Sequence, residues 1–418
     1  MINLSLENVS VVPLKDVVKR VKVGFVGSCN NDYCLSNEGV PMIRTTNLTK
    51  EGIKLENLKY INNKFHISHK KSQLNFGDIL IARHGHNGLA SLWEYKFDAQ
   101  CLNVVVVEPD ESLANKYYLT YLINSPLIQK QIKSLTGGSV QSVVNTKDIA
   151  DLLIPVPPLE KQKEIADFIS LFNKKIRINK SINKNLINIS KSIFRQKFLN
   201  YEGYEDFKDT DYGRIPSTFD VFTLNEISKE IVCGKTPSTK VEDNYGDKMP
   251  FITIPDMHNN VFIIETERKL SEKGIQSQKK KTLPKNSICV SCIATAGLVS
   301  LTYEESQTNQ QINSIICKDN ISPYFMYLYL NELSEYIKML GSGGSTTLNL
   351  NKNEFSKIKV AIPNNGDMNK FNDLIEPIFN KIKFNQLEII ELTKLRDTLL
   401  PKLMNGEINV SKINCDLD

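Results

Sequence analysis

The sequence predicts an α+β protein in which two duplicated globular domains alternate with two long helices that pair as an antiparallel coiled coil. Three observations predict this arrangement. The chain matches itself when it is shifted by about 206 to 210 residues, which indicates duplication of a whole unit because the period is too long for a solenoid. Each unit mixes short β-rich runs with helical segments, and each unit ends in a stretch with coiled-coil spacing.

The internal repeat consists of short runs that match in the same order in both halves. The matching runs are Pro13–Val17 with Thr223–Ile227, Pro41–Arg44 with Pro250–Thr253, Phe76–Ile81 with Lys285–Val290, Tyr117–Leu119 with Tyr324–Met326, Gly137–Ser139 with Gly343–Ser345, and Val156–Pro157 with Ile362–Pro363. One such match arises by chance, whereas a whole series in one order indicates duplication.

The globular part of each unit, about 12–158 and about 221–364, is expected to combine strands and short helices. The β-rich runs are Leu74–Ala82, Asn103–Glu108, Ser287–Ile293 and Ile312–Cys317. A helix is expected from Pro323, a favoured first-turn residue, to Leu340, where glycines follow. Strand order is not fixed by the sequence, so an α/β topology stays open beside α+β.

The long helices follow at about 159–199 and about 366–405, where apolar residues recur mostly at alternating steps of three and four. The predicted seam positions are Ile165, Ile169, Phe172, Ile176, Asn179, Leu186, Ile193, Phe371, Ile375, Ile378, Ile382, Asn385, Leu392 and Leu399, with Ile182, Ile189 and Leu395 on the same stripes. Asn179 and Asn385 occupy the same seam position of the two helices. They either fix the register or occupy an under-packed, wet part of the seam.

Duplication makes the two halves pseudo-equivalent, and a pseudo-two-fold arrangement follows most naturally if the helices run antiparallel. Apolar residues beyond the seam predict further interfaces on both helices. These residues are Leu171, Ile178 and Ile187 on the first helix, and Phe379, Phe384 and Ile390 on the second.

The composition narrows the class of protein. Of 418 residues, 41% are hydrophobic, enough for a core in each domain, and the net charge of +5 permits nucleic-acid binding without requiring it. No run of about 18 apolar residues could span a membrane, and no signal peptide opens the chain, so a cytoplasmic protein is expected. Cysteines inside apolar runs (Cys101, Cys289, Cys317) are typical of buried, reduced thiols.

Motifs for catalysis or metal binding are missing or weak. The sequence has no GxxxxGK[ST] nucleotide loop and no [DN]PP[YF] methyltransferase motif. Cys289 and Cys292 form a CxxC within an apolar strand and lack a second ligand pair, and His84 and His86 lack a third ligand. We therefore expect no metal site, no cofactor in this chain and no catalytic residue.

Three segments resemble the signatures of specificity subunits of type I restriction-modification systems. The segments are Leu152–Gln162 with Ile165-Ala166, which resembles the opening of the central helix; Gly213–Phe219, which resembles the opening of the second recognition domain; and Leu399–Ile408, which resembles the end of the second helix. The glycine-rich loops before Asn145 and Asn351 also fit. The chain departs from the pattern at Phe219, where Trp is commoner, and at Asn364–Met368, which replaces a Pro-rich, Glu-Gln segment.

The resemblance implies two target-recognition domains, each reading one half of a bipartite site in double-stranded DNA. It also implies that the helices dock two methyltransferase (modification) subunits and that restriction translocase-nuclease subunits join them. These partners are expected to use S-adenosylmethionine, ATP and Mg. A helix of about 40 residues is about 60 Å long, so it could span at most about 18 base pairs and set the spacer between half-sites.

In the resulting domain order, each recognition domain is followed directly by a long helix. The expected ranges are 1–158 for target-recognition domain 1, 159–200 for the central helix, 201–220 for a linker, 221–364 for target-recognition domain 2, 365–406 for the C-terminal helix and 407–418 for a tail.

Basic and amide side chains on loops of the globular domains are the candidates for DNA contact, because Arg and Lys reach guanine or phosphate and Asn pairs with adenine. The candidates are Arg44, Asn47, Lys70, Lys71, Arg83, His84, His86, Lys235, Lys240, His258, Lys279, Lys280 and Lys281. Arg44 and Arg83 are favoured because each follows an apolar strand-like run, and the Lys279–Lys281 run is expected to touch phosphate.

Two alternatives to a recognition subunit remain. Asp256, Glu267 and Lys269 fit the loose proline-aspartate…glutamate-x-lysine spacing of a stand-alone Mg-dependent nuclease. The other alternative is a coiled-coil interaction protein without a nucleic-acid role.

Overall fold

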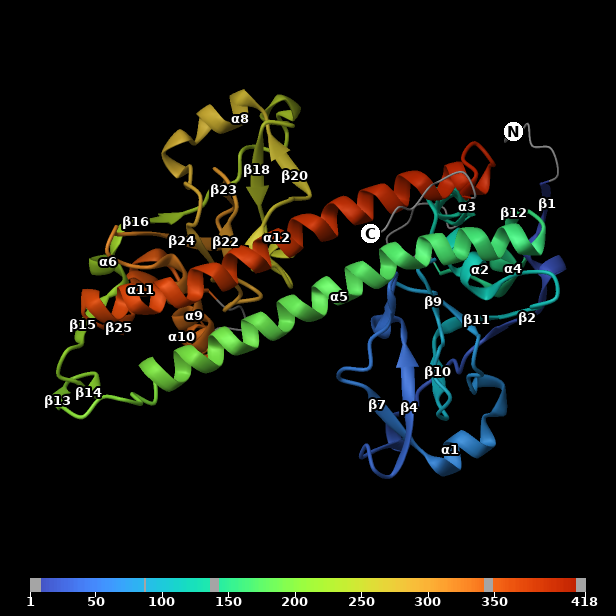
Figure 1. The fold of residues 1–418 in the computed structure, drawn as a ribbon, viewed down its shortest axis with the longest axis horizontal. Helices are drawn as coiled ribbons and strands as arrows, with labels where there is room; N and C mark the ends of the chain where they lie inside the picture. The colour runs from blue at the N-terminus through green and yellow to red at the C-terminus, as the bar shows by residue number, and fades with distance from the viewer. Residues whose placement is uncertain (1–8, 86–87, 136–142, 342–348, 411–418) are drawn as a thin grey trace. The chain divides into compact units, whose positions relative to one another are not determined.

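A computed structural model describes residues 9–85, 88–135, 143–341 and 349–410 (Figure 1). The chain divides into two compact units. The first comprises residues 1–177 and 390–418, and the second comprises residues 178–389. Each unit contains one globular domain and one part of each long helix.

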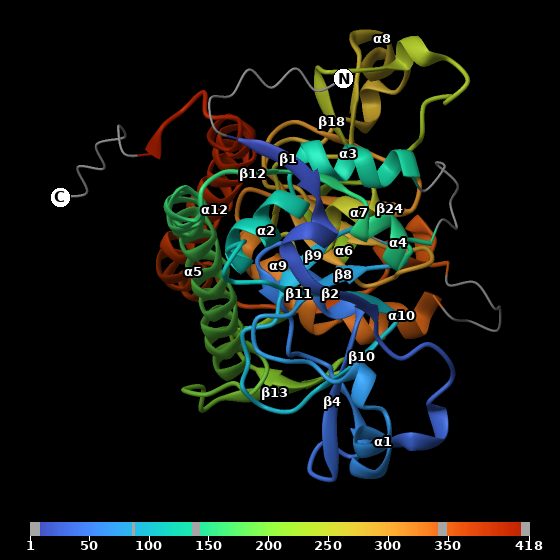
Figure 2. The same cartoon turned by 90° about the vertical axis from the view of Figure 1, so that its right-hand side faces the viewer.

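The first globular domain contains two four-stranded sheets. The proximal sheet has the order β2 (Val18–Val23), β11 (Val104–Pro109), β8 (Ile79–Ala82) and β9 (Ala90–Leu92). The distal sheet has the order β10 (Gln100–Leu102), β4 (Gly39–Arg44), β7 (Lys59–Asn62) and β3 (Tyr33–Cys34). All pairs are antiparallel except β10 with β4. Figure 2 shows the distal sheet at the lower end of this unit, beyond the proximal sheet.

Short elements complete the first domain. They are the pair β1 (Ser10–Pro13) and β12 (Leu153–Val156), the hairpin β5 (Leu48–Thr49) and β6 (Gly52–Ile53), the helices α1 (Asn63–Ser68), α2 (Lys116–Ile123), α3 (Pro126–Leu135) and α4 (Thr146–Ala150), and the 3-10 turns η1 (Leu14–Val17), η2 (Asn30–Asp32), η3 (Thr45–Asn47) and η4 (Lys70–Ser72). Because β1 pairs with β12, the chain enters and leaves the domain at neighbouring strands.

The second domain repeats this plan. Its proximal sheet is β16 (Ser228–Cys233), β24 (Ile312–Cys317), β21 (Ile288–Ser291), β22 (Val299–Thr302) and β19 (Phe262–Ile263), and its distal sheet is β17 (Tyr245–Gly246), β20 (Arg268–Leu270), β18 (Met249–Ile252) and β23 (Gln307–Thr308). The parallel pair of the distal sheet, β18 with β23, corresponds to β4 with β10. The duplication inferred from short sequence runs therefore extends to the strand order of both sheets, with β19 as an additional fifth strand in the second proximal sheet.

Short elements complete the second domain, and several of them have counterparts in the first. They are the pairs β15 (Asp220–Thr223) with β25 (Lys359–Ile362) and β13 (Phe207–Thr210) with β14 (Gly213–Pro216), the helices α6 (Leu224–Ile227), α7 (Ile254–Met257), α8 (Glu272–Ser277), α9 (Pro323–Glu332), α10 (Ser334–Gly341) and α11 (Lys352–Ser356), and the 3-10 turns η5 (Glu242–Asn244) and η6 (Lys279–Lys281).

The prediction of a single helix from Pro323 to Leu340 is wrong, because the chain forms two helices, α9 and α10, which are separated by Leu333. Two side-chain bonds compete with a continuous helix there. The Asn331 amide donates to the Tyr327 carbonyl at 2.8 Å, and the Ser334 hydroxyl donates to the Gly297 carbonyl at 2.8 Å.

The long helices are α5 (Leu159–Phe198) and α12 (Asn365–Met404), drawn green and red in Figure 1. In the first unit, Ile165 and Ile169 near the start of α5 share one core with Leu403 near the end of α12. In the second unit, Phe194 near the end of α5 shares a core with Phe371 near the start of α12. The helices therefore pair antiparallel, and the predicted fold is confirmed.

Every predicted seam position is buried or half-buried. Two further residues that the spacing places on the same stripes are exposed. Ile189 is 49% exposed and Leu395 is 51% exposed. Ser190 is buried in place of Ile189, and Arg396 is buried in place of Leu395. Spacing alone could not choose between neighbouring positions on these helices.

Candidate nucleic-acid interface

The strand β4 of the first domain ends at Arg44, and a hydrogen-bonded turn follows. The Asn47 Oδ1 accepts from the Arg44 backbone N–H at 3.0 Å, and the Asn47 amide donates to the Lys54 carbonyl at 3.4 Å. Asn47 is 4% exposed, so its side chain serves the turn and leaves no free edge for a base. Arg44 is half-buried, and its Nε has no hydrogen-bond partner.

The second domain builds the same turn from the residues proposed for a nuclease. The Asp256 Oδ2 accepts from the backbone N–H and the hydroxyl of Thr253 at 2.8 and 2.7 Å. The Asp256 Oδ1 accepts from the Glu267 backbone N–H at 2.8 Å. The carboxylate therefore caps a helix turn, as Asn47 does 209 positions earlier, and the nuclease alternative is not favoured.

No metal site accompanies this turn within the ranges that the structure describes, since they contain no group of three or more His, Cys, Asp or Glu that could hold an ion. Cys289 and Cys292 of the CxxC are both buried free thiols. Burial raises the pKa of Cys289 to about 12 and that of Cys292 to about 11, so both stay protonated at neutral pH.

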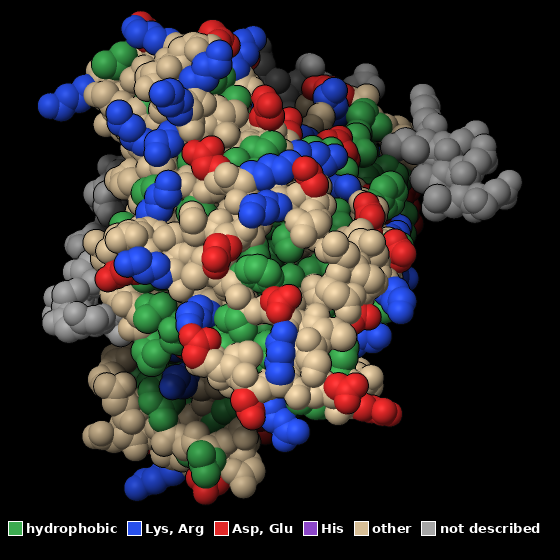
Figure 3. Space-filling model, turned by 90° about the vertical axis from the view of Figure 1, so that its left-hand side faces the viewer, with side chains coloured by type: hydrophobic (Ala, Val, Ile, Leu, Met, Phe, Trp, Pro, Cys, Tyr) green, Lys and Arg blue, Asp and Glu red, His purple; other side chains and the backbone are tan. Residues whose placement is uncertain are grey.

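The candidate lysines lie on one element in each domain. Lys70 and Lys71 are exposed on η4, and Lys279 and Lys280 are exposed on η6, each 209 positions later, with Lys281 half-buried beside them. In Figure 3, Lys and Arg side chains gather at the top of the face, where α8 lies in Figure 1. The distal part of each domain therefore carries a basic turn.

The other candidates lie elsewhere in their domains. Arg83 follows β8, is half-buried and donates from Nε to the Val144 carbonyl at 3.2 Å, and His84 beside it is exposed. The exposed candidates of the second domain are Lys235, Lys240 and His258. His86 and the two glycine-rich loops, Gly137–Ser139 and Gly343–Ser345, lie outside the described residues.

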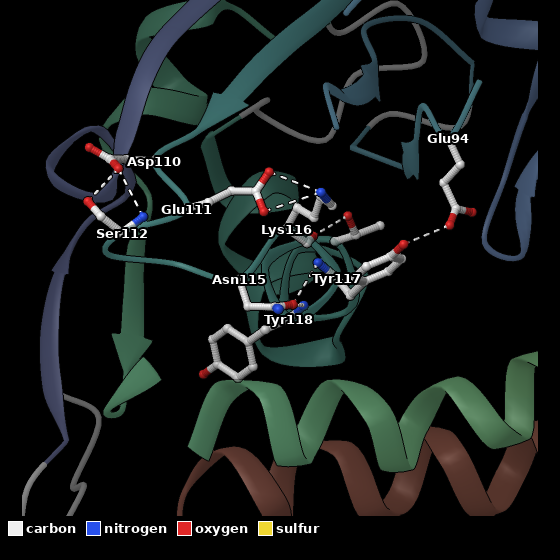
Figure 4. A network of polar contacts seen from close by, with 9 residues as sticks. Glu94, Asp110, Glu111, Ser112, Asn115, Lys116, Tyr117 and Tyr118 are labelled. Atoms are coloured by element: carbon white, nitrogen blue, oxygen red, sulfur yellow. Dashed lines mark hydrogen bonds and ion pairs between the residues drawn. The ribbon is translucent and has the colours of Figure 1, made fainter. Parts of the chain in front are cut away.

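Helix α2 fixes the first domain to α5 (Figure 4). The Asn115 side chain caps α2 by accepting from the N–H groups of Tyr117 and Tyr118, both at 3.0 Å. The Gln162 Oε1 of α5 accepts from the Asn115 N–H at 2.8 Å, and the Tyr118 hydroxyl donates to the Pro155 carbonyl at 2.9 Å. These bonds join the start of α5 to the domain.

The Tyr117 hydroxyl donates to Glu94 at 3.1 Å (Figure 4). Burial, reinforced by the Glu94 charge, raises the pKa of Tyr117 to about 12. The phenol is thus a neutral donor at physiological pH, and it anchors α2 from its outer side.

Polar residues interrupt the apolar seam within the second unit. Asn179 is 2% exposed, and its amide donates to Glu388 at 2.7 Å. Asn385 is fully buried, and its amide donates to the Asn183 Oδ1 at 2.8 Å, while the Asn183 amide donates to the Ile382 carbonyl at 3.2 Å. Asn179 and Asn385, which the sequence places at the same seam position, thus each bond across the helices to a different partner.

The seam of the first unit contains a polar pair that the sequence analysis missed. Arg396 is 5% exposed and donates to the Asn173 Oδ1 at 2.7 Å and to Asp397 at 2.9 Å. The residues 206 positions away in the repeat are Ser190 and Phe379, both fully buried in the second unit. The sequence did contain a signal for this pair. Arg396 lies four residues after Leu392 and three before Leu399, which is the spacing of a seam position.

Exposed apolar residues recur at equivalent positions of the two helices. Ile178 is 44% exposed and Phe384, 206 positions later, is 57% exposed. The same relation joins Ile189 to Leu395, at 49% and 51%. We call these four residues the apolar ridges.

Only some of the apolar residues predicted to lie exposed outside the seam are exposed. Leu171, Ile178 and Phe384 are exposed, whereas Ile187 and Ile390 are half-buried. Phe379 was wrongly predicted to be exposed, because its ring stacks on Tyr324 with centroids 4.6 Å apart.

Comparison with known proteins decides the family. The family model described as the type I restriction modification DNA specificity domain matches residues 7–188 and 216–394. The chain belongs to the type I restriction-modification DNA specificity family.

The chain is similar to proteins that are named as specificity subunits of type I restriction enzymes. It is 33% identical over 367 residues to the type I restriction enzyme HindI specificity subunit of Haemophilus influenzae, covering 73% of this chain and 80% of that one. It is 27% identical over 306 residues to the type I restriction enzyme MjaIX specificity subunit of Methanocaldococcus jannaschii, covering 71% and 70%.

A solved structure shares the fold of the specificity subunit. The crystal structure of a type I restriction-modification system S subunit from M. genitalium has a TM-score of 0.55 at 17% identity, covering 96% of this chain and 97% of that chain. Its family, and not this structural likeness, makes the specificity subunit a non-catalytic DNA-recognition component. Among its described helices, none has the length and apolarity to cross a membrane. The individual DNA-contact residues stay predictions.

Proposed function

We propose that this specificity subunit reads a bipartite site in double-stranded DNA, with one globular domain on each half-site. The observation that carries the proposal is that the two domains present the same basic turn at equivalent positions, Lys70-Lys71 and Lys279-Lys280. Lysines on such a turn suit phosphate contacts, which orient a protein on the duplex without reading sequence. Base readout then falls to neighbouring residues, with Arg44 and Arg83 favoured.

The antiparallel helices set the spacer between the half-sites in this proposal. Since α5 and α12 each contain 40 residues, each is about 60 Å long. The Asn183–Asn385 bond joins the two helices near their middle. Such cross-helix bonds support a fixed register, and a fixed register gives a fixed spacer.

The apolar ridges support docking of two copies of one partner. Ile178 and Phe384 are equivalent under the repeat, as are Ile189 and Leu395, so each helix offers the same kind of surface. Exposed apolar side chains at matched positions are typical of interfaces. We assign these surfaces to two methyltransferase subunits, with restriction translocase-nuclease subunits joining the complex.

The chemistry of modification and cleavage is assigned to those partners, which are expected to use S-adenosylmethionine, ATP and Mg in the cytoplasm. The proposed domains are 1–158 and 221–364 for recognition, 159–200 and 365–406 for the helices, 201–220 for a linker and 407–418 for a tail.

A domain exchange tests the split between half-sites. Residues 12–158 are replaced by the corresponding domain of a relative, and the methylated motif of the host is then sequenced. One half of the motif should change and the other should stay. A change in both halves would contradict independent reading.

A matched insertion tests the spacer role. Four residues are added after Asn183 in α5 and four before Asn385 in α12, which keeps the opposed positions of the two helices together. Each helix lengthens by about 6 Å, so the unspecified spacer should grow by about one to two base pairs. An active variant that keeps its spacer but changes a half-site would remove the spacer role.

A further inference from the structure

The basic turn of each domain follows a short helix that is built alike in both. Helix α1 begins after Asn62, whose Oδ1 accepts from the Phe65 N–H at 2.8 Å, and η4 with its lysines comes next. Helix α8 begins after Ser271, whose hydroxyl oxygen accepts from the Gly274 N–H at 3.2 Å, and η6 comes next. Every boundary of this segment recurs 209 positions later.

A buried glutamine holds the end of this segment in the first domain. Gln100 is fully buried at the start of β10. Its amide donates to the His66 carbonyl at 3.2 Å and to the His69 carbonyl at 3.3 Å. The His66 carbonyl also accepts from the Gln73 amide at 2.8 Å, and the His69 carbonyl accepts from the Ser72 N–H at 3.1 Å. Gln100 therefore adds a link from β10 to carbonyls that are already paired locally. His69 directly precedes Lys70.

The second domain places a glutamine in the same role. Gln307 is fully buried at the start of β23. Its amide nitrogen has three acceptors within hydrogen-bond distance, which its two N–H groups share: the Thr282 hydroxyl oxygen at 2.9 Å, the Ile275 carbonyl at 3.2 Å and the Gln278 carbonyl at 3.4 Å. The accepting residues Ile275 and Gln278 lie 209 positions after His66 and His69.

The amide is the side chain that suits this position. One NH2 group carries two donors, and it can therefore serve two carbonyls three residues apart. In the second domain the Gln307 Oε1 also accepts from the Gln278 amide at 2.7 Å. Because β10 and β23 belong to the distal sheets, each glutamine ties the lysine-bearing turn to its sheet.

We propose that Gln100 and Gln307 are positioning residues for DNA binding, each holding the lysine turn of its own domain in the orientation that meets phosphate. The proposal rests on the proposed function, since it needs the turns to contact DNA. The glutamines themselves are buried and touch no DNA. Their effect should therefore pass entirely through the lysines that follow.

The test uses the specificity subunit assembled with its methyltransferase subunits and a duplex that carries the motif methylated in the host. Binding is measured from 50 to 200 mM salt for Gln100→Met, which keeps the size of the side chain and removes both donors. Each lost phosphate contact reduces the steepness of log affinity against log salt concentration by about 0.9. If the variant loses the contacts of both Lys70 and Lys71, its fall in affinity from 50 to 200 mM salt should be about twelvefold smaller than that of the parent.

A double-variant cycle separates positioning from general stability. Gln100→Met should add nothing to Lys70→Ala/Lys71→Ala, because the same contacts are already gone, and it should add in full to Lys279→Ala/Lys280→Ala. The opposite pattern is expected for Gln307→Met, which provides an independent test should one variant fail to fold.

Gln162→Met is the matched control. Gln162 is also fully buried, and its amide donates to the carbonyls of Leu113 and Pro157 at 3.1 and 2.9 Å, away from the basic turn. This variant should lower the unfolding temperature without changing the salt slope.

Two results would overturn the positioning role: full additivity of Gln100→Met with Lys70→Ala/Lys71→Ala, or an unchanged salt slope in folded Gln100→Met and Gln307→Met. Either result leaves the proposed function standing when the unaltered complex binds its methylated motif. If the unaltered complex does not bind its methylated motif, the proposed function itself is contradicted.

Discussion

The bond between Asn183 and Asn385 predicts a large difference between a single and a double substitution. Asn385 is fully buried, and its Oδ1 already lacks a partner, so its one side-chain bond is the donation to Asn183 at 2.8 Å. Asn183→Leu strands the whole Asn385 amide, at a cost of about 1–3 kcal/mol. Replacing both residues by Leu removes the buried amide, so the double variant should be nearly neutral or more stable than the parent.

Hydrogen exchange of the α12 backbone around Asn385 measures this difference locally. A cost of about 1–3 kcal/mol corresponds to a loss of protection of about 5- to 150-fold in Asn183→Leu, and the double variant should regain it. Asn188→Leu is the control, because Asn188 is exposed on the same helix as Asn183.

Unchanged protection in Asn183→Leu would mean that water reaches Asn385, which is the wet-seam explanation. Recovery in the double variant, together with a changed spacer in the methylated motif, would support the register explanation.

Three further predictions concern other parts of the chain. Arg83→Ala should cost about 1–3 kcal/mol of discrimination at one half-site, measured by competition binding, and an unaltered motif at normal expression would remove Arg83 from the interface. Ile178→Asp and Phe384→Asp should each remove one methyltransferase subunit from the complex in native mass spectrometry, and full stoichiometry in both would exclude these positions. Burial raises the pKa of Cys101 and of Cys289 from about 9 to about 12, so the folded state disfavours their thiolates. The free energy of unfolding should therefore fall as pH rises from about 9 towards 12, and a flat profile in urea titrations would contradict this.

Helical periodicity predicted the long helices well, because spacing of three and four is a local property of the chain. Periodicity could not predict which residues outside the seam are buried by packing of a globular domain against the helix. Phe379 lies off the predicted seam, yet it is fully buried because Tyr324 and Tyr327 of α9 pack on it. The parallel pairing of β4 with β10 likewise joins segments far apart in sequence, and no local pattern specifies it.

The candidate interface was predicted in part. The lysine turns stand out in the sequence as basic runs, but their anchoring depends on contacts such as that between Gln100 and His66, 34 positions apart. A signal did exist, since Gln100 and Gln307 align when the chain is shifted onto itself. Asn47 and Asp256 show the converse, because residues with suitable chemistry for DNA or metal are used to hold turns.

The two ends of the helix pair are chemically unlike, which distinguishes one helix from the other. Asn173 meets Arg396 in the first unit, whereas the equivalent places in the second unit hold Phe379 and Ser190. From Phe168 to Phe198, α5 also carries lysines and arginines without one acidic residue, while α12 carries both signs. Two copies of α5 brought together would lose the arginine–asparagine bond and oppose like charges. Each α5 therefore selects an α12 over a second α5, which disfavours association of two chains through their α5 helices.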